Sequence, residues 1–138
     1  MLEIPIFGPD DGAAAVVAGA QRLELNRAGS YALGGLTPTL PELIALLSSF
    51  RPLALPGTPP IRIMIRPRGA PPPDGGHDFV YTRAELATMH ASIAGFLASG
   101  LLHGARGDGF VFGVLSPSME IDVPACKGLV EAAGGLDQ

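Results

Sequence analysis

Charged and polar side chains gather where a predicted strand ends and in the loop that follows it. Arg66 and Arg68 close a short apolar run, and Asp78 and Tyr81 stand in the loop ahead of a long helical segment. An arginine offers a rigid set of N–H donors that can hold a carboxylate or phosphate through two parallel hydrogen bonds. The two arginines therefore predict a site for a small anion, with Asp78 and Tyr81 as candidate acid–base or positioning groups.

A second cluster lies earlier in the chain and would complete such a site. Glu24 and Asn26 end another apolar run, and the string Gly34-Gly35-Leu36-Thr37-Pro38 then opens a helix. Free N–H groups at a helix start favour anions, and paired glycines permit positive φ. The candidate ligand-binding residues are Glu24, Asn26, Gly34, Gly35, Thr37, Arg66 and Arg68. The candidate catalytic residues are Glu24, Arg66, Arg68, Asp78 and Tyr81.

The same charges also have a purely structural interpretation. Buried charges must be paired whether or not they do chemistry, so one face of a sheet could hold an ion-pair network. Its members would be Glu3, Glu24, Arg62 and Arg66. For Glu24 and Arg66, the binding-site and the ion-pair interpretations are equally supported. Position favours the site for Arg68, nearest a strand end, and the network for Glu3, near a strand start.

The elements that must position these residues alternate along the chain. Short apolar runs bounded by Gly, Pro, Asp or Asn predict strands at residues 2–7, 22–26, 61–66 and 109–115. Helical periodicity predicts helices at residues 10–19, 38–50, 82–101 and 123–133. Their first turns are expected to begin at Asp10 or Asp11, at Thr37 or Thr39, at Thr82 and at Asp122. Four repeats of strand and helix predict a parallel sheet with right-handed crossovers.

Alternation within the strands distinguishes a small doubly wound sheet from half of a barrel. Residues 61–66 place isoleucines on one face and Arg62, Met64 and Arg66 on the other. Strands of a doubly wound sheet are buried on both faces and should be almost continuously apolar. One apolar and one charged face suits a barrel with helices outside. The alternation therefore favours an α/β fold that is half of a (β/α)8 TIM barrel over a doubly wound sheet, as one domain over residues 1–138.

Composition and charge exclude several classes of protein. Of 138 residues, 47% are hydrophobic and 16% charged, which indicates a folded chain and not a disordered one. The net charge is −4 with no basic stripe, so nucleic acid is not an expected partner. No apolar run reaches the roughly 18 residues of a membrane span, and the first residues do not resemble a signal peptide. We expect a cytoplasmic protein, with the nucleus as an alternative.

Candidate metal ligands are sparse. Cys126 is the single cysteine, which excludes an internal disulfide and a cysteine-cluster site. It falls near a predicted helix start, where a thiolate is mildly stabilised, but we favour a structural role. His77, His90 and His103 have spacings that match no metal motif.

Several strings, taken in order, resemble the CutC copper homeostasis family. They are RLELN at 22–26, GGLTP at 34–38, MIRPRG at 64–69, DFVY at 78–81 followed by Glu85, and GFVFGVL at 109–115 followed by Ile121 and Asp122. The resemblance covers essentially the whole chain. It implies a (β/α)8 barrel, of which this chain matches the first four units, and it implies copper homeostasis with Cu(I) as the bound ion.

The chain also departs from the family pattern. Family members continue into a fifth strand where this chain stops, so the resemblance implies a truncated N-terminal half. Residues 70–77 are an insertion that is typical of a stiff surface loop. The family's proposed copper ligation rests on cysteines in the first two strands, where this chain has Pro5 or Ile6, and Asn26. Cu(I) prefers thiolate or thioether donors, so copper binding through these positions is not expected.

Three functions therefore remain open. The first is a copper homeostasis protein that binds Cu(I), which follows from the resemblance. The second is a barrel enzyme of unspecified reaction that binds a small anion, which the hard polar residues favour. The third is an inactive half-barrel that survives by assembling. Four strands cannot close a barrel, and an interior face including Met64 and Phe110, Phe112 or their neighbours would lack its opposite wall. We therefore expect a homo-oligomer.

Overall fold

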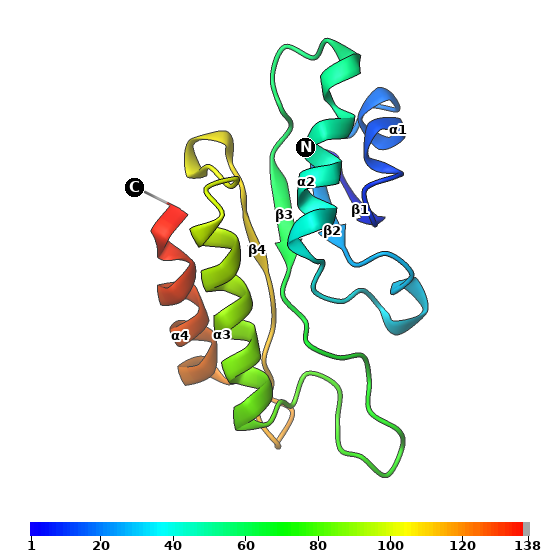
Figure 1. Cartoon of the computed structure of the whole chain (residues 1–138). Helices are drawn as coiled ribbons and strands as arrows, with labels where there is room; N and C mark the ends of the chain where they lie inside the picture. Colours follow the sequence, from blue (N-terminus) through cyan, green and yellow to red (C-terminus); the bar gives the residue numbers. More distant parts are fainter. Residues whose placement is uncertain (137–138) are drawn as a thin grey trace.

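The structure is a computed structural model that describes residues 1–136. Four parallel strands form one sheet in chain order: β1 (Glu3–Phe7), β2 (Arg22–Asn26), β3 (Ile61–Met64) and β4 (Gly109–Val111). A helix follows each strand: α1 (Gly12–Val17), α2 (Leu40–Ser49), α3 (Arg83–Ala98) and α4 (Val123–Ala133). Short 3-10 turns occupy Tyr31–Leu33, Arg51–Leu53, Gly104–Arg106 and Gly134–Leu136. The predicted order of four β/α units is confirmed (Figure 1).

Strand register gives the sheet two unlike faces. Glu3 pairs with Arg22, and Glu24 pairs with both Pro5 and Arg62, so these side chains share one face. The apolar residues between them point to the other face, against which the helices pack (Figure 1). The charged face is only half-buried. This arrangement is an arc of a barrel wall, with its helices outside and its interior open.

The hydrophobic core lies between the sheet and its helices. Strands β2 and β3 contribute Leu23, Leu25, Ile61 and Ile63, and the helices contribute Leu43, Leu46, Met89, Ile93 and Leu129, all of them fully buried. On α3, Met89, Ile93 and Phe96 are buried, and Leu86 and Leu97 pack against the core. Isoleucine and leucine at alternating strand positions thus fix which face of the sheet the helices cover.

The helix starts follow local sequence signals in three of four cases. Thr39 with Glu42 and Thr82 with Glu85 form complete capping boxes, which selects Thr39 over Thr37 as the start of α2. Asp122 caps α4 through the N–H of Ala125. The helix α1 has Asp11 before it, but no side chain caps this helix. Asp11 has right-handed helical φ and ψ, whereas a capping side chain acts from an extended backbone.

At β4, the phenylalanines lie on the helix side of the sheet and their neighbours lie on the interior face. Phe110 pairs with Ile63, so it lies on the helix side of the sheet, and both Phe110 and Phe112 pack against the core. Gly109 and Val111, their neighbours, pair with Arg62 and Met64 on the interior face. No helix among residues 1–136 is long and apolar enough to cross a membrane.

Candidate ligand site at the carboxyl ends of the strands

Arg66 stands at the centre of the candidate site, just beyond the end of β3. Its Nη1 donates to the carbonyl of Gly35 at 3.0 Å and to that of Leu33, and its Nη2 donates to Oδ2 of Asp78 at 2.8 Å. Its backbone N–H donates to Oγ1 of Thr37 at 2.8 Å, and its carbonyl accepts from the N–H of Thr37 at 3.0 Å. Only 6% of the side chain is exposed. One arginine thus joins the turn after β2 to the loop after β3.

The turn at Gly34 and Gly35 leaves room for the Arg66 guanidinium to contact its carbonyls. Gly34 and Gly35 have φ of +81° and +89°. A Cβ on Gly34 would lie 2.8 Å from Nη1 of Arg66, and one on Gly35 would lie 2.2 Å from Oδ1 of Asn26. Both positions therefore need glycine for backbone conformation and for space.

Arg68 holds the far end of the same loop. Its Nε donates to Oε1 of Glu85 at 2.7 Å, and its Nη2 donates to the carbonyl of Val80 at 2.6 Å. The guanidinium also lies over the ring of Tyr81, 5.1 Å from the ring centre. Hydrogen bonds from Arg68 and from the N–H of Thr82 lower the pKa of Glu85, although partial burial opposes them.

Three buried polar atoms near this cluster have no hydrogen-bond partner within residues 1–136. They are Oδ1 of Asn26, Nε of Arg66 and the hydroxyl oxygen of Tyr81. Buried polar atoms are nearly always paired in folded proteins, so three such atoms around the ends of β2 and β3 call for an explanation. A bound ligand or water that pairs with them is one such explanation.

The environment of Tyr81 keeps its hydroxyl protonated. Burial raises the pKa of Tyr81, while the positive charges of Arg66 and Arg68 work in the opposite direction without overcoming it. At neutral pH the phenol is therefore a hydrogen-bond donor. Arg66 acts on this pKa through its charge and through its side-chain hydrogen-bonding group, so its guanidinium lies near the Tyr81 hydroxyl.

The carboxylates of the interior face pair differently from the predicted network. Glu3 pairs with Arg22, and Glu24 accepts from Nδ2 of Asn26 at 3.2 Å. Arg62 donates to the carbonyl of Asp108 at 3.3 Å. Within residues 1–136 no ion pair joins Glu24 to Arg62, Arg66 or Arg68. The reason is register: Arg22 lies directly beside Glu3, and Arg66 extends over the strand ends toward the loops.

Two structurally important residues lie outside the predicted set. Phe79 has a φ of +61°, and the centre of its ring lies 4.9 Å from Cζ of the Arg66 guanidinium. A positive φ is uncommon for a bulky residue, and no residue pattern in the loop signals it. Asp108, whose side chain is fully buried, accepts from the N–H groups of Ile61 and His103 and pairs with Arg106. It fixes the opposite, amino-terminal end of β3 and β4.

The single thiol lies in an apolar pocket. Sγ of Cys126 is 3.8 Å from the carbonyl of Val114, and Phe79, Phe112 and Ile121 line the same pocket. The three histidines are exposed. No group of three or more His, Cys, Asp or Glu side chains within residues 1–136 is placed to hold a metal ion. A lone thiol does not fit a closed Cu(I) site, which needs further soft donors.

Comparison with known proteins establishes the family. The sequence profile of the CutC family matches residues 1–138. The chain belongs to the CutC family. It is 35% identical over 137 residues to the CutC family protein of Mesorhizobium japonicum, covering 99% of this chain and 45% of that protein. It is 34% identical over 135 residues to the copper homeostasis protein cutC homolog of Drosophila melanogaster, covering 98% and 43% respectively.

A solved CutC structure supports the fold. The crystal structure of a CutC protein from Streptococcus agalactiae, named for copper homeostasis, superposes with a TM-score of 0.73 at 28% identity. The match covers 99% of this chain and 56% of the other. The chain spans less than half the length of the curated CutC relatives described above. The partial-barrel architecture is thus that of a CutC-type TIM barrel.

Proposed function

We propose that this part of the CutC barrel binds a small oxyanion at the carboxyl ends of β2 and β3. The observation that carries the proposal is the set of three buried polar atoms without a partner, which belong to Asn26, Arg66 and Tyr81. A ligand oxygen that accepts from Arg66 and Tyr81 would supply two of the missing hydrogen bonds. Carboxyl ends of strands are also where barrels of this class place their ligands.

The contacts of Arg66 restrict the chemistry of this ligand. Its Nη1 makes two hydrogen bonds within the protein and its Nη2 makes one, so Nε is the one guanidinium nitrogen that has no partner. A ligand oxygen can therefore accept a hydrogen bond from Nε. Oδ1 of Asn26 is an unpaired acceptor beside Gly35, and it favours a ligand that also carries a hydroxyl. A small hydroxycarboxylate combines these features.

Two further side chains would act on such a ligand. The Asp78 carboxylate accepts hydrogen bonds from Arg66 and from the N–H of Phe79. Its role would therefore be to orient the arginine and not to bind the ligand directly. Tyr81, protonated at neutral pH, would donate to a ligand oxygen. A barrel enzyme acting on a small anion would use Tyr81 as the candidate acid.

The experiment is a binding titration of the chain with glycolate, acetate and phosphate. We expect glycolate to bind more tightly than acetate, because only glycolate offers a hydroxyl to Asn26. Tyr81→Phe should weaken glycolate binding about tenfold, since one hydrogen bond to a charged group is lost. Tyr31→Phe is the matched control, because that tyrosine is 76% exposed. Equal binding by the wild type and Tyr81→Phe would reject the site.

Copper homeostasis is the second candidate, and the names of the relatives favour it. Cu(I) would here be cargo and not a resident cofactor. Cys126 is the one thiol in the sequence, and it lies apart from the histidines in an apolar pocket. We propose that any Cu(I) binding by this chain alone is weak, because a second soft donor is missing from that pocket.

The four-stranded sheet also bears on self-association of the chain. In the four-stranded sheet, β1 and β4 are both edges. Exposed apolar side chains occur in the segments next to these edge strands along the chain, with Leu2 and Val17 around β1 and α1 and with Ile121, Val123 and Val130 between β4 and the end of α4. We propose that two copies associate with β4 of one beside β1 of the other. A twofold axis along the barrel keeps all strands parallel and yields eight of them.

A further inference from the structure

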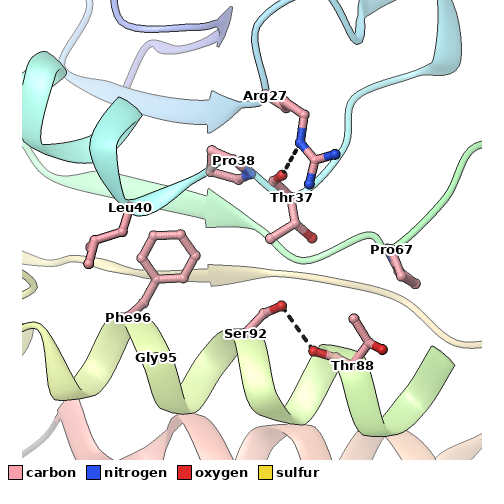
Figure 2. Close-up of a pocket in the computed structure, with 9 residues that line it drawn as sticks. All are labelled: Arg27, Thr37, Pro38, Leu40, Pro67, Thr88, Ser92, Gly95 and Phe96. Atoms are coloured by element: carbon pink, nitrogen blue, oxygen red, sulfur yellow. Dashed lines mark hydrogen bonds between the residues drawn. The ribbon is translucent and has the colours of Figure 1, made fainter. Parts of the chain in front are cut away.

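The helical layer is divided between α2 and α3. Helix α1 packs on α2 and α3 packs on α4, but a cavity of about 290 Å³ separates the middle pair. One wall is formed by the segment from β2 into α2, and the other by α3 (Figure 2). Leu40 and Phe96 form its apolar end, and Thr88 and Ser92 line the α3 wall. The volume is close to the lower limit of natural ligand pockets.

A glycine in the last turn of α3 lines the cavity. Gly95 lies on its wall, and a Cβ at this position would meet no atom within 4 Å. Its φ is not in the left-handed region, so the backbone does not require glycine there. Glycine is also the least favourable residue in a helix after proline. Neither packing nor backbone conformation requires glycine at position 95, and the missing side chain leaves space on the cavity wall.

The cavity carries an uncommitted positive charge at its rim. Nε of Arg27 donates to the carbonyl of Thr37 at 2.8 Å, which fixes the side chain over the opening. Within residues 1–136 its two terminal nitrogens donate no hydrogen bond and no carboxylate forms an ion pair with it. The nearby Glu42 accepts from the N–H of Thr39 in the α2 capping box and from the N–H of Ala28.

The hydroxyl groups of the α3 wall offer acceptors. Oγ1 of Thr88 donates to the carbonyl of Ala84 at 3.1 Å, and Oγ of Ser92 donates to that of Thr88 at 2.9 Å. Their protons are thus used inside the helix, while the lone pairs of both oxygens stay free to accept. Both oxygens can accept a hydrogen bond from a ligand. Because their protons are already donated within the helix, they do not compete with Arg27 as donors to an anion.

We propose that this cavity is a second binding site, for a small amphipathic carboxylate. The carboxylate would pair with the terminal nitrogens of Arg27, and the apolar body would lie between Phe96, Leu40 and Pro38. Aromatic or aliphatic groups gain from contact with such a wall. The site lies among the helices outside the sheet and uses none of the three unpaired atoms near the strand ends. It is therefore independent of the proposed oxyanion site.

Amide-resolved NMR titration of the chain with 3-phenylpropionate tests the proposal, with 3-phenylpropanol as the neutral probe of similar shape. We expect shifts at residues 27, 37–40 and 88–96, and tighter binding of the carboxylate than of the alcohol. Arg27→Gln should weaken carboxylate binding about tenfold and leave alcohol binding nearly unchanged. Arg51→Gln is the matched control, because that arginine is exposed and lies outside the cavity.

A second variant tests the cavity itself. Gly95→Leu should abolish binding of both probes, and it should fold at least as well as the wild type because leucine favours a helix. Ala94→Leu, at the exposed neighbouring position, should bind both probes normally. Equal affinity for both probes in the wild type would overturn the role of Arg27. Binding that survives Gly95→Leu, or shifts confined to other residues, would overturn the site.

Discussion

Arg66 and Asp78 form an ion pair at 2.8 Å that joins the end of β3 to a loop twelve residues further along the chain. The arginine side chain is 6% exposed and the aspartate 31%. Because the same guanidinium also holds the carbonyl of Gly35, the pair fixes two loops against each other. The geometry of the candidate site thus depends on this contact more than on any single strand.

Removing the carboxylate should therefore destabilise the chain measurably. We expect Asp78→Ala to lower the free energy of unfolding by about 1–3 kcal/mol, because it leaves a buried donor of Arg66 without a partner. Urea unfolding measures this difference. Asp74→Ala is the matched control, since that exposed aspartate lies in the same loop and should change stability very little. Equal effects of the two substitutions would contradict the role given to the pair.

The glycine turn gives a sharper comparison. Gly35→Ala combines a positive φ with a Cβ placed 2.2 Å from Oδ1 of Asn26. Gly29→Ala has a φ of +75° but meets nothing within 4 Å. We expect about 1 kcal/mol of destabilisation at Gly29 from backbone strain alone. At Gly35 we expect about 2–4 kcal/mol. Similar unfolding midpoints for the two variants would show that Asn26 and the turn are not in close contact.

The pKa of Glu85 predicts an acid-dependent loss of stability. Its folded pKa lies below the ordinary value of 4.5, so the ionised form stabilises the fold. That contribution is complete above pH 4.5 and is lost as pH falls below it toward the folded pKa. Glu85→Gln keeps a residue that can form a capping box but removes the charge opposite Arg68. The stability of this variant should fall less between pH 6 and pH 3, as followed by urea unfolding. An unchanged pH profile would mean that the Arg68 contact contributes nothing.

Copper binding can be tested with a competing chelator. We expect the chain to bind Cu(I) weakly and without a fixed stoichiometry, because Cys126 supplies its one thiolate. A competition titration against a Cu(I) chelator measures the affinity. A tight one-to-one complex that disappears in Cys126→Ala would show that this thiol forms a genuine metal site.

Sedimentation across a concentration series tests assembly. We expect a dimer, because β1 and β4 are both edges and the segments next to them along the chain carry exposed apolar side chains. Val130→Lys, on the helix that follows β4, should weaken association. Ile44→Lys on α2 should not, although Ile44 is also about half-exposed. A compact monomer that unfolds cooperatively would count against the half-barrel pairing.

Local patterns made most of the fold predictable. In β3, isoleucines alternate with Arg62 and Met64. Because strand side chains alternate between faces, this pattern predicts which residues share a face of the sheet. The starts of α2 and α3 follow from Thr-x-x-Glu spacings, which act within one turn of helix. The strands β3 and β4 end earlier than predicted, at Met64 and Val111.

The site was less predictable because its contacts link distant segments. The pairing of Arg66 with Asp78 depends on the path of an irregular loop, in which Phe79 adopts a positive φ. The pairing of Glu3 with Arg22 depends on strand register, which neither strand specifies alone. The unpaired atoms of Asn26 and Tyr81 become visible only when all neighbours are in place.

The NMR signal of the Arg66 Nε–H group during titration with glycolate tests the oxyanion site most directly. We expect this resonance to shift downfield and to exchange more slowly with water, because the ligand oxygen becomes the acceptor that Nε lacks. In Tyr81→Phe the same shift should require about ten times more glycolate. An Arg66 Nε–H signal that stays unchanged while glycolate binds elsewhere would contradict the oxyanion site.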